Sequence, residues 1–251
     1  MEKIFQNKVA LVTGGSFGIG RAAAIAFANR GARVVIADWV EDNETLNAIK
    51  SSGGDAIFVK SNVSKDADVK MLVEKTISTY GRLDYAFNNA GVEGASAPTQ
   101  DCTEENWERT VGVNLKGVWL CMKYEIPQML KQGKGAIVNN ASIAGLVGFP
   151  GIPAYVASKH GVIGLTKNAA LENAKLGIRV NVVCPGVIKT PMIDRFTGKQ
   201  KEVEKQFETM EPIGRMGQPE EVAEAVMWLC SDGASFVTGH SLAVDGGWVA
   251  Q

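Results

Sequence analysis

Short apolar runs alternate with longer stretches of helical periodicity along the 251-residue chain. The first run, residues 9–12, is continuously apolar, which is typical of a strand buried on both faces. An alanine-rich stretch at 19–30 follows, with apolar positions at helical spacing and Gly31 after it. Residues 33–37 predict a second buried strand that leads directly to Asp38.

The alternation continues toward the C-terminus. Further strands are predicted at 56–60, 83–87, 135–139, 179–183 and 241–244, and helices near 41–52, 66–80, 104–131, 153–176 and 219–230. Strands that alternate with helices form right-handed β-α-β units with parallel strands. We therefore predict one α/β domain over residues 1–251, a Rossmann-type doubly wound parallel sheet with helices on both faces.

The segment from about 186 to 217 breaks this alternation. It contains Pro191, Gly198, Pro212 and Gly214, with a charged, helical stretch at 199–208 inside it. Long loops in compact domains often cover binding sites, so we predict that this segment is a substrate lid.

Composition narrows the functional classes. Hydrophobic residues make up 45% and charged residues 21% of the chain, and its net charge is −1. Such a balance is typical of a globular protein and provides no basic field for nucleic acid or an anionic membrane. A charged N-terminus and the lack of a long apolar run favour a cytoplasmic protein without a membrane partner.

The cysteines favour packing over metal binding. They form no C-x-x-C pair, and only two histidines accompany them, so we expect buried thiols and no metal site. The four are Cys102, Cys121, Cys184 and Cys230.

A glycine-rich turn joins the first predicted strand to the first helix. Gly14 allows a tight turn, Gly18 lets the backbone approach a pyrophosphate, and Gly20 lets the helix pack near the strand. The helix then directs free N–H groups at the phosphates. No Gly-Lys-Ser/Thr follows, which argues against a triphosphate site. We expect the turn to bind a dinucleotide through Gly14, Ser16, Gly18, Ile19 and Gly20.

Asp38 ends the second predicted strand, about twenty residues beyond this turn, where a carboxylate can bind the adenosine ribose hydroxyls. Its charge would repel a 2′-phosphate, and the next residue is Trp39 in place of a cation. The alternative is that Asp38 caps the following helix. The pattern favours NAD over NADP.

Tyr155 and Lys159 lie four residues apart in a helical pattern and therefore on one face. A neighbouring ammonium favours a phenolate, so we expect Lys159 to lower the pKa of Tyr155 toward the working range. Ser142 follows the strand predicted at 135–139, at the edge where ligands bind, and can hold a substrate oxygen or cap a short turn.

Together these residues resemble the short-chain dehydrogenase/reductase family, in its compact single-domain subgroup. The resemblance covers essentially the whole chain and includes the glycine-rich turn, Ser142 and the Tyr155-x-x-x-Lys159 pair. Its other marks are Asn88-Asn89-Ala90-Gly91, Asn114, Pro185-Gly186 with Thr190, and Val244-Asp245-Gly246-Gly247.

The resemblance implies a role for each catalytic position. Tyr155 would be the general acid/base, and Ser142 would orient the substrate oxygen. Lys159 would lower the pKa of Tyr155 and bind the nicotinamide ribose. Asn114 would hold a water in a proton relay to Lys159. The activity implied is hydride transfer between NAD and a secondary alcohol or ketone.

The resemblance also assigns cofactor contacts. Asn89, Ala90 and Gly91 would line the adenosine side. Pro185, Gly186, Ile188 and Thr190 would lie at the nicotinamide. Where the family often has Asp-Val or Asp-Leu near the adenine, this chain has Asn62-Val63, whose amide can still bind the adenine edge.

The loops around this site are mostly apolar, which favours a hydrophobic or cyclic ketone. Glu93 is the exception and can bind a substrate hydroxyl or face solvent. The candidate pocket residues are Val92, Glu93, residues 143–149, Val187, Met192, Ile193, Phe196, Phe207 and Met210. The apolar ones can equally serve lid packing or a subunit contact.

The resemblance further implies a homotetramer packed through the helices near 104–131 and 153–176, with Trp248 and Val249 at a contact. Three alternatives are kept: a non-catalytic NAD-sensing module, an isomerase or dehydratase, and a 3-oxoacyl-carrier reductase. The intact catalytic set argues against a sensor. The chain length argues against an isomerase or dehydratase, because such relatives usually carry a larger second substrate domain. The third should prefer NADPH and show a basic patch, and neither signal is clear.

Overall fold

Seven parallel strands form one sheet in the order β3-β2-β1-β4-β5-β6-β7. The structure is a computed structural model that describes residues 2–198 and 200–251, apart from the Glu204 side chain. The strands are Val9–Thr13 (β1), Arg33–Asp38 (β2), Ala56–Lys60 (β3), Tyr85–Asn88 (β4), Gly135–Asn140 (β5), Ile178–Pro185 (β6) and Ser241–Val244 (β7).

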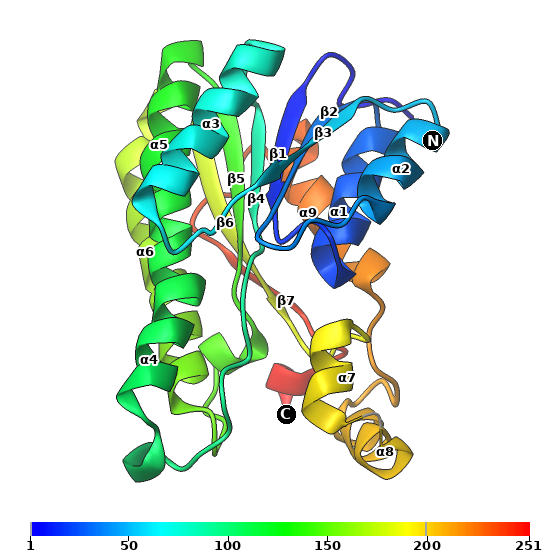
Figure 1. Ribbon diagram of the computed structural model, residues 1–251, viewed down its shortest axis with the longest axis vertical. Helices are drawn as coiled ribbons and strands as arrows, with labels where there is room; N and C mark the ends of the chain where they lie inside the picture. The colour runs from blue at the N-terminus through cyan, green and yellow to red at the C-terminus, as the bar shows by residue number, and fades with distance from the viewer. Residues whose placement is uncertain (1, 199) are drawn as a thin grey trace.

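Helices cover both faces of this sheet (Figure 1), which confirms the predicted doubly wound fold. Helices α1, α2 and α9 lie on one side, and α3, α5 and α6 on the other. The helices are Gly18–Asn29 (α1), Glu44–Ser51 (α2), Asp66–Tyr80 (α3), Glu104–Val111 (α4), Gly117–Gln132 (α5), Pro153–Asn173 (α6), Pro191–Thr197 (α7), Lys201–Met210 (α8) and Pro219–Cys230 (α9).

Strand β1 shows why its sequence is continuously apolar. Successive side chains of a strand point to opposite faces. Ala10 and Val12 pack into the cluster beneath α1 and α9, whereas Leu11 packs into the cluster beneath α5 and α6. Burying a side chain the size of Leu11 contributes roughly 1.5–3 kcal/mol.

The predicted helix at 104–131 is divided in the structure. A π-helical segment, Gly112–Lys116, separates α4 from α5. Within it, the buried Asn114 amide bonds both backbone groups of Val92: Val92 N–H donates to Oδ1 at 2.8 Å, and Nδ2 donates to the Val92 carbonyl at 2.9 Å. A π turn accommodates one extra residue, and such turns are frequent at functional sites.

The segment 186–217 holds two helices where one was predicted. The short helix α7 was missed, and α8 corresponds to the stretch predicted at 199–208, of which Lys199 lies outside the described residues. Both helices project beyond the carboxyl end of the sheet (Figure 1). Across residues 2–198 and 200–251, no helix is long and apolar enough to cross a membrane.

The order of the strands determines where along the sheet a ligand can bind. The chain builds β1, β2 and β3 outward and then returns to place β4 on the other side of β1. At such a switch point the loops after neighbouring strands separate, which leaves a crevice beyond their carboxyl ends.

Candidate active site

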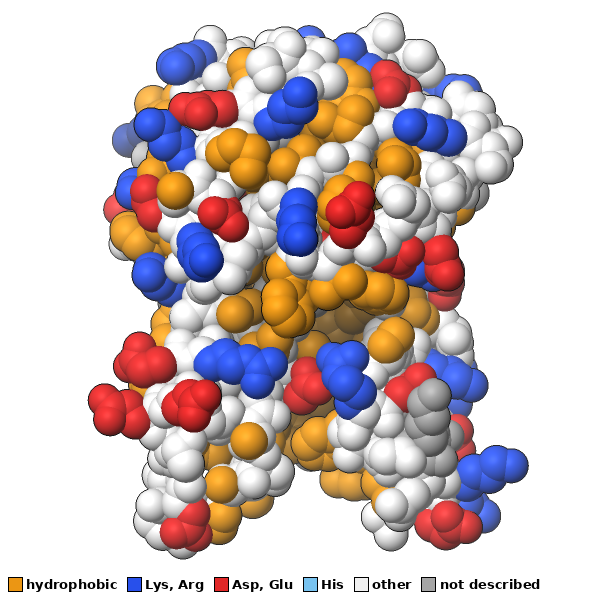
Figure 2. All heavy atoms as spheres, in the orientation of Figure 1, with side chains coloured by type: hydrophobic (Ala, Val, Ile, Leu, Met, Phe, Trp, Pro, Cys, Tyr) orange, Lys and Arg blue, Asp and Glu red, His pale blue; other side chains and the backbone are white. Residues whose placement is uncertain are grey.

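A cavity of about 790 Å³ lies at this switch point. The turn after β1, the ends of β2 and β3, the loops after β4, β5 and β6, helix α6 and the lid all contribute to its wall. Figure 2 shows the hollow between two lobes, lined by hydrophobic side chains and bordered by charged ones.

The glycine-rich turn fits a dinucleotide phosphate. Gly14 and Gly18 have φ of +62° and +52°, a region that favours glycine. A Cβ at Gly20 would collide with the Gly14 carbonyl group and the Asn89 amide. At the start of α1, Phe17 provides no side-chain capping hydrogen bond, so the first N–H groups of α1 remain available to an anion.

The predicted contacts of this turn separate into two groups. Gly14, Gly18 and Ile19 line the cavity, as does Phe17, which the sequence reasoning missed. Ser16 and Gly20 do not line it, because Ser16 is fully buried and Gly20 packs against the strand-end backbone. These two residues shape the turn from behind.

Asp38 connects the turn to the end of β2. Its carboxylate accepts the Ser16 N–H at 3.2 Å and the Val40 N–H at 3.2 Å, and it lines the cavity. The capping alternative is wrong, since α2 begins at Glu44 and its N-cap is Asn43.

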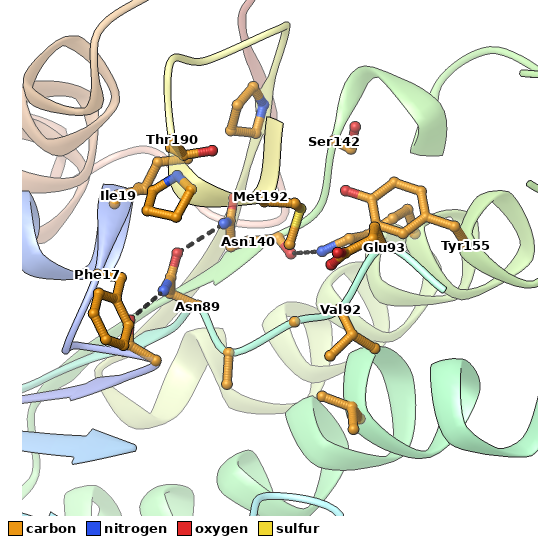
Figure 3. Close-up of a pocket in the computed structure, with 18 of the residues that line it drawn as sticks. Phe17, Ile19, Asn89, Val92, Glu93, Asn140, Ser142, Tyr155, Thr190 and Met192 are labelled. Carbon is orange, nitrogen blue, oxygen red and sulfur yellow. Dashed lines mark hydrogen bonds between the residues drawn. The ribbon is translucent and has the colours of Figure 1, made fainter. Parts of the chain in front are cut away.

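The amides beyond β3 and β4 stabilise the cofactor side of the cavity. Asn89 donates through Nδ2 to the Thr13 and Gly14 carbonyl groups, both at 3.1 Å, and accepts from Asn140 Nδ2 at 2.9 Å (Figure 3). Asn62 accepts the N–H and hydroxyl of Ser64. The predicted residues Asn62, Val63, Asn89, Ala90 and Gly91 all line the cavity.

Tyr155 from α6 and Ser142 from the loop after β5 face the same cavity (Figure 3). Ser142 also caps the short turn Ile143–Gly145, because its Oγ accepts the Ala144 N–H at 3.1 Å, so both predicted roles are compatible. Lys159 Nζ donates to the Asn140 carbonyl at 2.8 Å and lies 5.4 Å from the centre of the Tyr155 ring.

Asn114 lies behind these residues. It is fully buried and does not line the cavity, and its Nδ2 donates to Ser158 Oγ at 3.3 Å. The amide therefore fixes the loop carrying Val92 against α6. Its predicted water relay stays a prediction.

The pKa of Tyr155 differs from the sequence expectation. Burial is the largest cause and raises it, hydrogen bonding by Ser142 lowers it, and the Glu93 charge raises it more weakly; together they bring the pKa to about 12. The Lys159 ammonium is directed at the Asn140 carbonyl, and burial lowers the pKa of Lys159 to about 8. Desolvation therefore dominates the pKa of Tyr155, and the Lys159 charge is not among the causes of its shift.

The loop after β6 completes the predicted nicotinamide end. Pro185, Gly186, Ile188 and Thr190 line the cavity. Behind them, buried Glu211 accepts the Val187 N–H at 2.8 Å. Glu211 was not predicted from the sequence, because it lies 24 positions from the backbone group that it binds.

Comparison with known proteins agrees with this geometry. A family model described as "Enoyl-(Acyl carrier protein) reductase" matches residues 14–249. Cyclohexanol dehydrogenase from Acinetobacter sp. (strain SE19) is 48% identical over 257 residues, covering 100% of both chains. 2,5-Dichloro-2,5-cyclohexadiene-1,4-diol dehydrogenase from Sphingobium indicum is 43% identical, covering 97% of this chain and 98% of the other. The crystal structure of levodione reductase superposes with a TM-score of 0.93 at 36% identity, covering 98% and 99%.

The chain belongs to the short-chain dehydrogenase/reductase family. It is an oxidoreductase that acts on alcohols with a nicotinamide cofactor. The glycine-rich turn, the free start of α1 and the small residues Ala90 and Gly91 provide the space that such a cofactor requires.

The substrate end of this dehydrogenase is mostly apolar. Phe196 and Phe207 connect the two lid helices, with ring centres 6.0 Å apart. Met210 is the last residue of α8; its side chain is exposed and does not line the cavity. The predicted residues that do line the cavity are Val92, Glu93, Ile143, Ala144, Phe149, Val187, Met192, Ile193, Phe196 and Phe207.

One ion pair crosses this end of the cavity. Arg195 of α7 donates to both carboxylate oxygens of Glu93, Nε to Oε1 at 2.8 Å and a terminal nitrogen to Oε2 at 3.1 Å. Glu93 therefore does not simply face solvent. Arg195 is a site residue that the sequence reasoning missed.

Proposed function

We propose that this protein is an NAD-dependent dehydrogenase of cyclic secondary alcohols, with Tyr155 as its general acid/base. One observation carries the proposal: the Tyr155 and Ser142 hydroxyls face a cavity whose neighbouring walls are apolar. The similar proteins named for cyclohexanol and for a cyclohexadiene diol support a ring-shaped substrate.

The residues would divide the chemistry as follows. When bound, the nicotinamide ring accepts or supplies the hydride. Ser142 Oγ holds the substrate oxygen, and the Tyr155 oxygen takes the alcohol proton in oxidation or donates a proton in reduction. The Asn140 carbonyl holds the Lys159 ammonium, which would bind the ribose there and stabilise the phenolate as it forms.

The preference for NAD is supported by charges at the adenosine end. Asp38 places a carboxylate there, and the exposed Trp39 follows it. The neighbouring cation, Arg21, is already paired with Asp42 and Glu44, both at 2.8 Å. A 2′-phosphate would therefore meet the Asp38 carboxylate, while the Arg21 guanidinium is already engaged by two acids.

Absorbance at 340 nm tests this proposal. Purified protein is mixed with NAD⁺ or NADP⁺ and with cyclohexanol, acyclic secondary alcohols or a 3-hydroxyacyl thioester. We expect turnover with NAD⁺ and cyclohexanol at least about tenfold above that with NADP⁺. A preference for NADP⁺ with the thioester would favour the 3-oxoacyl-carrier reductase alternative instead.

A further inference from the structure

The Glu93–Arg195 ion pair forms a charged part of a largely apolar cavity wall. Glu93 follows the loop after β4, and Arg195 lies on α7, 102 positions later. The Glu93 side chain is 26% exposed, whereas that of Arg195 is 59% exposed. The carboxylate is therefore the inner member of the pair, and the guanidinium forms the outer one.

The carboxylate lies near the reacting group. Glu93, Tyr155, Val92 and Met192 line the same cavity, and Glu93 and Tyr155 lie in the same part of the view in Figure 3. Burial is the main cause of the raised pKa of Tyr155, and the charge of Glu93 adds to it more weakly. A ring held at Tyr155 would thus have the Glu93 carboxylate close to another of its positions.

Arg195 leaves the carboxylate able to accept another hydrogen bond. The fork uses two N–H groups, whereas the two oxygens of a carboxylate offer about four acceptor positions. Burial alone would raise the pKa of Glu93, but the hydrogen bonds from Arg195 and the charges of Arg195 and Arg109 hold it below its ordinary value. The group is an anion at neutral pH.

We propose that Glu93, oriented by Arg195, accepts a hydrogen bond from a second hydroxyl group on the substrate ring. The inference rests on the proposed function and narrows its substrate class to cyclic diols and hydroxyketones. A ring carboxylate is disfavoured, because it would be repelled by Glu93 and would compete with it for Arg195.

The test compares kcat/KM for the 1,2-, 1,3- and 1,4-cyclohexanediols with that for cyclohexanol. In the wild type we expect at least one diol to exceed cyclohexanol. Glu93→Leu should lower that ratio at least about tenfold, since a hydrogen bond to a charged group is lost. Glu93→Gln keeps a neutral acceptor and should give an intermediate ratio.

A matched control removes a carboxylate elsewhere. Glu224 accepts from Arg30 through both oxygens, at 2.7 and 2.6 Å, and does not line the cavity. Glu224→Leu should therefore leave the ratio unchanged. Calorimetric titration of the diol into Tyr155→Phe with NAD⁺, with and without Glu93→Leu, measures binding without turnover and should show the same loss of affinity.

The outcomes separate the two proposals. Turnover of cyclohexanol with an unchanged ratio in Glu93→Leu would overturn the role of Glu93 and leave the proposed function intact. A higher kcat/KM for 4-hydroxycyclohexanecarboxylate than for every diol would also overturn the role of Glu93. It would indicate that Arg195 binds a carboxylate of the substrate. No oxidation of any cyclic alcohol by the wild type would overturn both.

Discussion

The burial of Tyr155 favours one direction of the reaction over the other. Burial raises its pKa to about 12 and so stabilises the neutral phenol, which is the proton donor needed for reduction. Oxidation needs the phenolate. The local environment therefore keeps Tyr155 protonated at neutral pH, which favours reduction over oxidation.

The raised pKa of Tyr155 predicts opposite pH dependences for oxidation and reduction. The rate of alcohol oxidation should rise with pH through the alkaline range as the phenolate population grows, whereas ketone reduction should fall there. Measurement of kcat/KM in both directions from pH 6 to pH 11 checks this. Oxidation that is independent of pH, with chemistry rate-limiting, would contradict the assignment of Tyr155.

Glu125 is a buried acid outside the active site. Its Oε2 accepts from Asn88 Nδ2 at 3.0 Å, and the same Asn88 nitrogen donates to Asn139 Oδ1 at 3.0 Å. Burial raises the pKa of Glu125 to about 7, although the Asn88 hydrogen bond acts against this shift. The folded protein therefore favours the protonated acid.

This shift predicts a pH-dependent stability. The folded pKa of Glu125 exceeds its ordinary value of 4.5, so its stabilising contribution is present at acidic pH and is lost as pH rises through about 7. Glu125→Gln should remove that loss, on the order of 3 kcal/mol between pH 4.5 and pH 8. Urea unfolding of both proteins at several pH values measures it. Parallel pH dependences would contradict the prediction.

The site residues differ in how far the sequence reveals them. Tyr155 and Lys159 are four positions apart on one helix, so their shared face could be predicted. Glu93 and Arg195 are brought together only by the packing of α7 over the cavity. The pKa of Tyr155 is set mainly by burial, which the spacing of Tyr155 and Lys159 does not encode.

At the scale of elements, the turn between β1 and α1 and the end of β2 form one cofactor-selecting unit. Asp38 binds the backbone N–H of Ser16 and so belongs to both parts. A substitution that removes the charge of Asp38 should therefore alter the preference between NAD⁺ and NADP⁺ while the protein still folds.

The corresponding prediction uses Asp38→Asn with Trp39→Arg. The amide oxygen can still accept a backbone hydrogen bond, whereas the carboxylate charge is lost and a cation is gained. We expect kcat/KM for NADP⁺ relative to NAD⁺ to rise at least about tenfold. Steady-state kinetics with both cofactors measure it. A ratio unchanged from the wild type would show that another element selects the cofactor.

The elements were predictable where burial imposed a clear period. The helix 66–80 and the strands 56–60 and 241–244 match α3, β3 and β7 in full. The π-helical segment could not be foreseen, because the apolar pattern continues through it while Asn114 bonds to a distant loop. Helix α7 is short and begins at Pro191, within a segment rich in turn residues.

At the scale of the whole molecule, the outer helices leave large apolar side chains exposed. Trp107 of α4, Trp119 of α5 and Leu171 of α6 are 40%, 46% and 82% exposed. Large apolar side chains exposed on the outer helices are typical of subunit contacts. The family resemblance implies a homotetramer through the same helices.

Light scattering coupled to size-exclusion chromatography tests this assembly. We expect a mass near four times the 26.8 kDa chain. Trp119→Glu should reduce the mass, because a buried, unpaired charge is costly at an interface. The matched change Trp39→Glu, on an exposed residue of the cofactor side, should not. A monomeric wild type would contradict the prediction.

The role of Tyr155 in proton transfer is tested by comparing the wild type with Tyr155→Phe in cyclohexanol oxidation at 340 nm, alongside NADH binding followed by fluorescence. The ring and its packing are kept, and only the hydroxyl that moves the proton is removed. We expect NADH affinity to remain within about threefold, while kcat falls at least about a hundredfold. Retained turnover with Tyr155→Phe would show that another group transfers the proton.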